Sequence, residues 1–143
     1  MKTFLISLFV FSLSIVKISS AQEFYFCDYV DDNWNPVGAS SEFPAGGINF
    51  LTKLNSPVFN TLYMWVIYKI DDQGNDIDFV NEYAMRVDPS TETTGARFFC
   101  TTDKIYFQPG KYRVYFIYES DKENMFKYGN LKKYLSKGEV TVN

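Results

Sequence analysis

The 143-residue sequence contains no histidine, only two cysteines and no excess of basic residues. The absence of histidine excludes the nucleophile–histidine pairs of many hydrolases and every zinc site that uses imidazole. The 14 lysines and arginines against 17 aspartates and glutamates give a net charge of −3, whereas a nucleic-acid surface needs concentrated basic charge. Ala45-Gly46-Gly47 contains no lysine and no helical pattern follows it, so it indicates a turn and no phosphate loop. We therefore expect no catalytic residue, no cofactor and no nucleic-acid partner, and hence a protein that is not an enzyme.

The one long apolar stretch lies at the N-terminus and is typical of a secretory signal peptide. Lys2 supplies the positive charge, an apolar core follows, and small residues end the segment at Ala21. The core is shorter than the roughly 20 residues of a membrane span, so we expect cleavage of residues 1–21 and no span in residues 22–143. Cleavage removes two lysines and leaves 12 basic against 17 acidic side chains, a net charge of −5. The expected location is secreted or periplasmic.

Cys27 and Cys100 are the two cysteines. In an oxidising compartment a single pair of cysteines is expected to form a disulfide, because no reducing system keeps the thiols reduced. Closing so long a loop would stabilise the fold by about 4 kcal/mol in the chain-entropy treatment. A redox function would require Cys-x-x-Cys spacing, which these two residues lack.

Short runs of aromatic and β-branched residues, separated by turn sequences, predict one all-β domain over residues 22–143. The expected strands are 24–30, 47–54, 62–70, 77–87, 96–101, 111–119 and 136–142. About seven strands at nearly regular spacing predict a single antiparallel β-sandwich. No segment repeats apolar residues at helical spacing over three turns, so residues 122–135 are expected to form a loop with at most one helical turn.

Residues 108–116 resemble a known structural corner. Pro109-Gly110, followed by Tyr112 and an alternating apolar strand, is similar to the tyrosine corner of immunoglobulin-like and fibronectin-like β-sandwiches, where the tyrosine hydroxyl bonds to the preceding backbone. The resemblance implies a generic, bacterial-style Ig-like sandwich with Pro109, Gly110 and Tyr112 in structural roles. It names no specific family, since Val114 stands where antibody-like domains have their second cysteine.

Alternation along two strands predicts the faces of the sheets. In strand 111–119, Tyr112, Val114 and Phe116 point inward if Tyr112 forms the corner. Strand 62–70 is apolar on both parities, so one set must face outward or be covered. With the two strands as neighbours, the candidate binding face consists of Tyr63, Trp65, Ile67, Arg113, Tyr115 and Ile117. A contiguous aromatic surface of this kind marks a binding site, but Trp65 in the core, or residues 120–135 folded over the face, is the alternative.

Acidic side chains gather in two turns. They are Asp28, Asp31 and Asp32 in the first and Asp71, Asp72, Asp76 and Asp78 in the second. Calcium takes oxygen ligands from such loops, but the Asp-x-Asp-x-Asp-Gly pattern with its distant glutamate is missing. We expect solvated turns and no metal, with calcium left open as the alternative.

The sequence favours an exported, non-catalytic binding or structural module that meets a protein partner. One alternative is a carbohydrate-binding module, because secreted sandwiches hold sugars on aromatic side chains and the chain has 11 tyrosines. The other is a secreted hydrolase inhibitor that inserts loop 88–95 or loop 122–129. The oligomeric state has no signature in the sequence.

Overall fold

The computed structural model describes residues 22–59, 62–86, 95–124, 131 and 133–143. The predicted signal peptide, most of loop 88–95 and part of loop 122–129 lie outside the described residues. The described chain is all-β, as predicted, and its one helical element is the short 3-10 helix η2, Glu119–Asn124. This helix begins three residues before the predicted loop at residue 122.

The described residues form eleven strands. They are β1 Glu23–Cys27, β2 Tyr29–Val30, β3 Pro36–Val37, β4 Glu42–Phe43, β5 Gly46–Val58, β6 Leu62–Ile70, β7 Asp76–Arg86, β8 Ala96–Cys100, β9 Ile105–Phe107, β10 Gly110–Tyr118 and β11 Ser136–Val142. Each of the seven predicted strands is present, and the bounds of β6 and β11 are those expected. The predicted strand 24–30 is divided at Asp28 into β1 and β2, and the short β3, β4 and β9 were not predicted.

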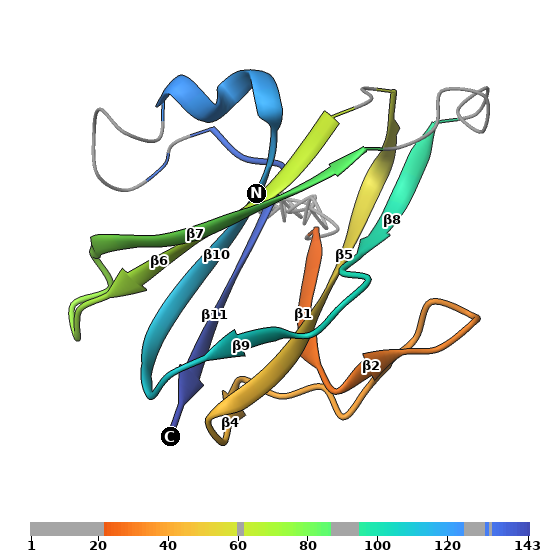
Figure 1. The fold of residues 1–143 in the computed structure, drawn as a ribbon. Helices are drawn as coiled ribbons and strands as arrows, with labels where there is room; N and C mark the ends of the chain where they lie inside the picture. Colours follow the sequence, from red (N-terminus) through yellow and green to blue (C-terminus); the bar gives the residue numbers. More distant parts are fainter. Residues whose placement is uncertain (1–21, 60–61, 87–94, 125–130, 132) are drawn as a thin grey trace, which may run out of the picture.

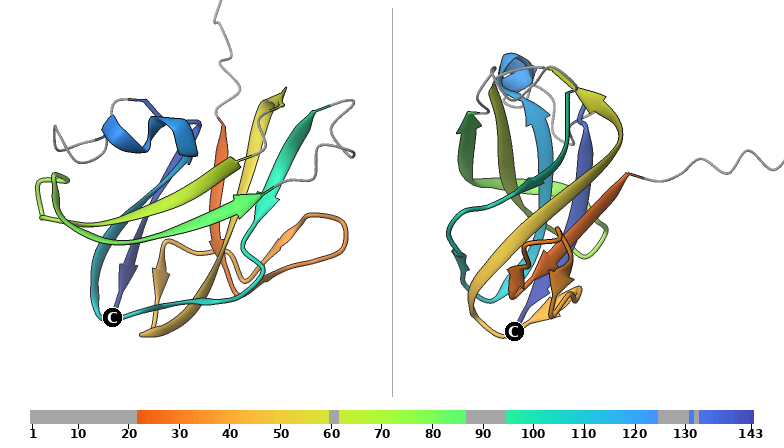
Figure 2. Two further views of the ribbon diagram at one scale, coloured as in Figure 1. Left: turned by 45° about the horizontal axis from the view of Figure 1, so that its top comes forward. Right: turned by 90° about the vertical axis from the view of Figure 1, so that its right-hand side faces the viewer.

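Two sheets lie against each other (Figures 1 and 2). One sheet has the order β4-β11-β10-β6-β7, and the other has the order β1-β5-β8, with β9 paired to the first residues of β5. All these pairs are antiparallel except β4 with β11, which is parallel. The short hairpin of β2 and β3 forms a third, two-stranded sheet beside β1 and β5.

The main core lies between the two large sheets and consists mostly of aromatic rings. Tyr112, Val114 and Phe116 belong to it, so the predicted parity of strand 111–119 is confirmed. The ring of Trp65 on β6 packs 6.4 Å from that of Phe50 on β5 and 5.0 Å from that of Phe116. The hydroxyl of Tyr112 donates a hydrogen bond of 2.9 Å to the carbonyl of Gln108, which is the contact expected of a tyrosine corner.

The prediction of an exposed aromatic face on β6 and β10 is wrong. Its six residues, Tyr63, Trp65, Ile67, Arg113, Tyr115 and Ile117, are all at most 6% exposed. In the register of β6 and β10, Ile67 lies opposite Val114 and Trp65 opposite Phe116, so the β6 residues face the core. Arg113, Tyr115 and Ile117 lie on the outer face of the same sheet.

That outer face is covered by the chain that follows β10. Tyr115 and Ile117 pack in a second buried cluster with Met64, Val66, Tyr68 and Leu131. The ring of Tyr134 lies 5.5 Å from that of Tyr115, and Asp121 of η2 accepts a hydrogen bond from Lys133. Covering by the segment after β10 and burial of Trp65, the two alternatives that the sequence left open, are both observed.

The predicted disulfide between Cys27 and Cys100 is also wrong, because both residues are free thiols. Cys27 pairs with Asn49 and Cys100 pairs with Leu51, so the whole width of β5 lies between them. Two strand spacings place their Cα atoms about 10 Å apart, whereas a disulfide requires less than about 7 Å. Strand order within the sheet, which the sequence does not display, keeps the two cysteines apart.

Candidate functional site

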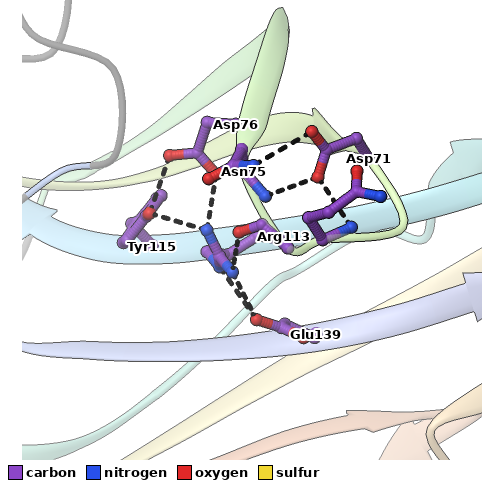
Figure 3. Close-up of polar contacts among 8 residues, drawn as sticks. Asp71, Asn75, Asp76, Arg113, Tyr115 and Glu139 are labelled. Atoms are coloured by element: carbon purple, nitrogen blue, oxygen red, sulfur yellow. Dashed lines mark hydrogen bonds and ion pairs between the residues drawn. The ribbon is translucent and has the colours of Figure 1, made fainter.

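Two turns of this chain are built on the same five-residue pattern. Residues 31–35 are Asp-Asp-Asn-Trp-Asn and residues 71–75 are Asp-Asp-Gln-Gly-Asn. In each turn, the first aspartate accepts hydrogen bonds from the backbone N–H groups two and four residues later, at 2.8–3.0 Å. Its second carboxylate oxygen accepts a bond of 3.1 Å from the side-chain amide of the final asparagine, as Figure 3 shows for Asp71 and Asn75.

The two turns differ at their fourth residue, where the backbone must be left-handed. Gly74 has φ of 80° there, which glycine adopts without cost, whereas Trp34 has φ of 60°. Among the described residues Trp34 is the single non-glycine with positive φ. A side chain in this conformation costs about 1–2 kcal/mol, so the first turn holds a tryptophan where glycine fits better.

Trp34 lies on the outer face of the sheet formed by β1, β5 and β8. Its ring centroid is 6.0 Å from that of Phe98 on β8, and the two residues are 37% and 41% exposed. On the same face, the Nζ atom of Lys53 lies 5.7 Å from the ring centroid of Phe98 and 5.8 Å from that of Tyr25 on β1. We call these four residues, Tyr25, Trp34, Lys53 and Phe98, the aromatic surface.

Buried groups hold the aromatic surface in place. Leu51 of β5 is fully buried on the same face, and the side-chain amide of Asn49 donates to the carbonyl of Asp28, at 2.7 Å. The hydroxyl of Thr101 donates to the Asn49 side chain and accepts from the N–H of Phe50. These hydrogen bonds connect β5 to the residue before the β2–β3 hairpin and to the residue after β8, so they fix the positions of the strands that carry the aromatic surface.

The thiols beneath this face are poor nucleophiles. Burial, followed by the charges of Asp28 and Cys100, raises the pKa of Cys27 to about 11, and burial raises the pKa of Cys100 as well. Because the thiolate is the reactive form of cysteine, neither side chain is suited to covalent catalysis at neutral pH.

A second polar cluster lies on the outer face of the other sheet (Figure 3). The guanidinium of Arg113 contacts the carboxylates of Asp76 at 2.8 Å and Glu139 at 2.6 Å, and it donates to the carbonyl of Gly74 at 2.7 Å. Tyr115 donates to the other oxygen of Asp76 at 2.7 Å. Burial alone would lower the pKa of Arg113, but Glu139 and Tyr115 outweigh it and raise that pKa. The cluster ties β10 and β11 to the turn between β6 and β7, which is a structural role.

The described parts of the chain contain no group of three or more histidine, cysteine, aspartate or glutamate side chains that could hold a metal ion. The oxygens of Asp31 and Asp71 instead accept backbone and amide hydrogen bonds, which lower the pKa of both carboxyls. No described helix is long and apolar enough to cross a bilayer.

No protein-family model matches the chain, and no curated protein matches it.

The sequence did not point to the aromatic surface. Its four residues come from β1, the β2–β3 turn, β5 and β8, and only the strand order places them together. One signal was available in the sequence, since Asp-Asp-x-x-Asn occurs twice and has glycine in one copy and tryptophan in the other.

Proposed function

We propose that this protein is an exported, non-catalytic module with an Ig-like sandwich fold, which binds a protein partner through the aromatic surface. Support for the Ig-like part comes from the Tyr112 corner at the start of β10 and from the strand order β11-β10-β6, which corresponds to the G, F and C strands of Ig-like domains. Trp65 on β6 packs in the core, as does the tryptophan of strand C in those domains.

The observation that carries the binding function is Trp34. Trp34 belongs to neither buried core cluster, yet it occupies a position whose backbone costs energy for any residue except glycine. Strain of this kind is concentrated at functional sites, and tryptophan is among the residues most enriched at the energetic centres of protein interfaces. Exposed Phe98 beside it, with Lys53 and Tyr25, provides the surrounding contacts.

The test is affinity capture with three forms of the purified domain and the envelope and secreted proteins of its own organism. Unmodified protein, Trp34→Gly and Tyr106→Ala are compared, since Tyr106 on β9 is an aromatic residue outside the aromatic surface and is more exposed, at 80%, than Trp34, at 37%. We expect a partner that the unmodified protein and Tyr106→Ala both retain and that Trp34→Gly loses. Retention of that partner by Trp34→Gly, with the same affinity, would refute the assignment of this surface.

One observation favours a carbohydrate as the second candidate ligand. The rings of Trp34 and Phe98 are both accessible, and exposed aromatic faces stack on the C–H faces of sugars. The two ring planes are inclined by 41°, so they do not form the flat platform that a linear polysaccharide would prefer. Binding of the unmodified protein to a glycan array, lost in Trp34→Gly, would replace the protein partner with a glycan.

A further inference from the structure

One edge of the five-stranded sheet is open. Among the described strands, β7 pairs with β6 alone, and it lies at the end of the sheet (Figures 1 and 2). An edge strand carries N–H and C=O groups that can pair with a strand of another chain. The first half of β7 is protected, because Ile77 and Val80 have no partner on β6 and such bulges bend an edge away from pairing. From Asn81 to Arg86 the register is regular, so this half is the open part of the edge.

The backbone of this regular half shows which groups face the open edge. The N–H of Glu82 donates to the side-chain oxygen of Asn81, at 2.8 Å, so it points away from β6. Successive residues of a strand direct their N–H and C=O groups to opposite sides, so those of Ala84 and Arg86 also point away from β6. Asn81 occupies the N–H of Glu82 in the single chain, whereas the exposed Ala84 and Arg86 offer theirs to another strand.

The charges of this half are complementary to themselves in an antiparallel pair. When two copies are centred on Ala84, Glu82 of each copy lies opposite Arg86 of the other. No described residue forms an ion pair with Arg86, whereas Lys122 of the same chain holds the Glu82 side chain in place. Opposite charges that face each other across two strands stabilise the pair, so the symmetric register brings each Arg86 next to a carboxylate.

The apolar side chains match in the same register. Tyr83 of one copy lies opposite Met85 of the other, on the side of the sheet that faces the core. Both side chains are only half-buried, and they border a cavity of about 210 Å³ beside residues 100–105. A second copy would cover apolar surface of both. The paired stretch is short and its interface is small, so the association is weak and depends on concentration.

We propose that two copies of this chain associate through antiparallel pairing of residues 82–86 of β7, centred on Ala84. The two five-stranded sheets then form one continuous sheet across the dimer axis. This interface is independent of the aromatic surface, whose strands β1, β5 and β8 belong to the other sheet. Its failure would therefore leave the proposed partner-binding function untouched.

Sedimentation equilibrium of the purified protein, from micromolar to millimolar concentration, measures the association. We expect a monomer–dimer equilibrium that Arg86→Glu weakens about tenfold, because the opposite-charge pairs become like-charge pairs. Lys137→Glu makes the same change of charge at an exposed residue of β11 and should leave the equilibrium unchanged. A monomer at every concentration, or equal weakening by the two variants, would overturn the proposal.

Cysteine cross-linking tests the register. In a pair centred on Ala84 the two Cα atoms at this position lie about 5.5 Å apart, so Ala84→Cys should form a disulfide-linked dimer under mild oxidation. Asp78→Cys, exposed on the same strand, lies outside the paired stretch and should stay monomeric. Cys27 and Cys100 react slowly, because burial raises the pKa of both thiols, and the unmodified protein controls for them.

Equal cross-linking of the two cysteine variants would refute this register. Absence of cross-linked Ala84→Cys in a sample that sediments as a dimer would refute it as well. Loss of the dimer in Trp34→Gly would assign the association to the aromatic surface and overturn the proposal.

Discussion

Replacing Trp34 by glycine is expected to lower the free energy of unfolding by about 1–3 kcal/mol. Relief of the left-handed backbone contributes about 1–2 kcal/mol in favour of the variant. Loss of the buried part of the indole, which is 37% exposed, costs about 1–2 kcal/mol, and loss of the ring contact with Phe98 costs about 0.5–1.5 kcal/mol more. The greater freedom of glycine in the unfolded chain costs about 0.5–1 kcal/mol, so the losses exceed the relief, but the net cost stays below the roughly 3–5 kcal/mol of truncating a core tryptophan.

Two companion variants separate strain from lost contacts. Trp34→Ala loses the ring but keeps the strained backbone, so it should be about 1 kcal/mol less stable than Trp34→Gly. In the twin turn, Gly74→Ala should cost about 1–2 kcal/mol through strain alone, because the nearest atom to the added Cβ, Nη2 of Arg113, is 3.5 Å away. Equilibrium unfolding in urea, followed by circular dichroism, measures all three. The reasoning is refuted if alanine at position 34 is as stable as glycine.

Four further predictions concern other parts of the fold. Arg113→Ala should destabilise by about 3–5 kcal/mol, since it leaves the fully buried Asp76 carboxylate without its cation, and a small loss in urea unfolding would contradict this. Tyr112→Phe should lower the free energy of unfolding by about 0.5–1.5 kcal/mol in the same assay. An unchanged free energy of unfolding would mean that the hydrogen bond from Tyr112 to Gln108 does not stabilise the fold. Hydrogen bonds from Asn75 lower the pKa of Asp71 in the folded protein, so the ionised carboxylate stabilises the fold fully above about pH 4 and this stabilisation is lost as the pH falls further. Asp71→Asn should therefore make the free energy of unfolding less dependent on pH below about pH 4. Reductant should leave the thermal midpoint unchanged, because Cys27 is a free thiol.

Local sequence signals correctly predicted the strands and the residues of β10 that face the core. The strands at 62–70 and 136–142 have the predicted bounds, and Tyr112 bonds to the backbone of Gln108 as its corner motif implied. These features depend on neighbours in sequence, because alternation, β-branched content and Pro-Gly turns act over a few residues.

The binding face could not be predicted in the same way. Strand 62–70 is apolar on both parities because both of its faces are covered, one by the opposite sheet and one by the segment after β10. Alternation places Arg113 correctly on the outer face of its sheet, but Asp76 and Glu139 pair with its charge there and the side chain is buried. A charged side chain marks a solvent face only when no partner reaches it, and the partners come from β7 and β11.

The sequence by itself determined the all-β class, the strand positions and the corner at Tyr112, because each follows from the conformational preferences of adjacent residues. Only the tertiary structure decided which side chains lie together on each face of the sheets and which of them are buried, because strand order and register bring distant residues together or keep them apart. Strand β5 separates Cys27 from Cys100, and the same four-stranded sheet brings Tyr25, Lys53 and Phe98 together on one face, where Phe98 contacts Trp34. Pairing between strands is a property of the whole chain, and no short stretch of sequence encodes it.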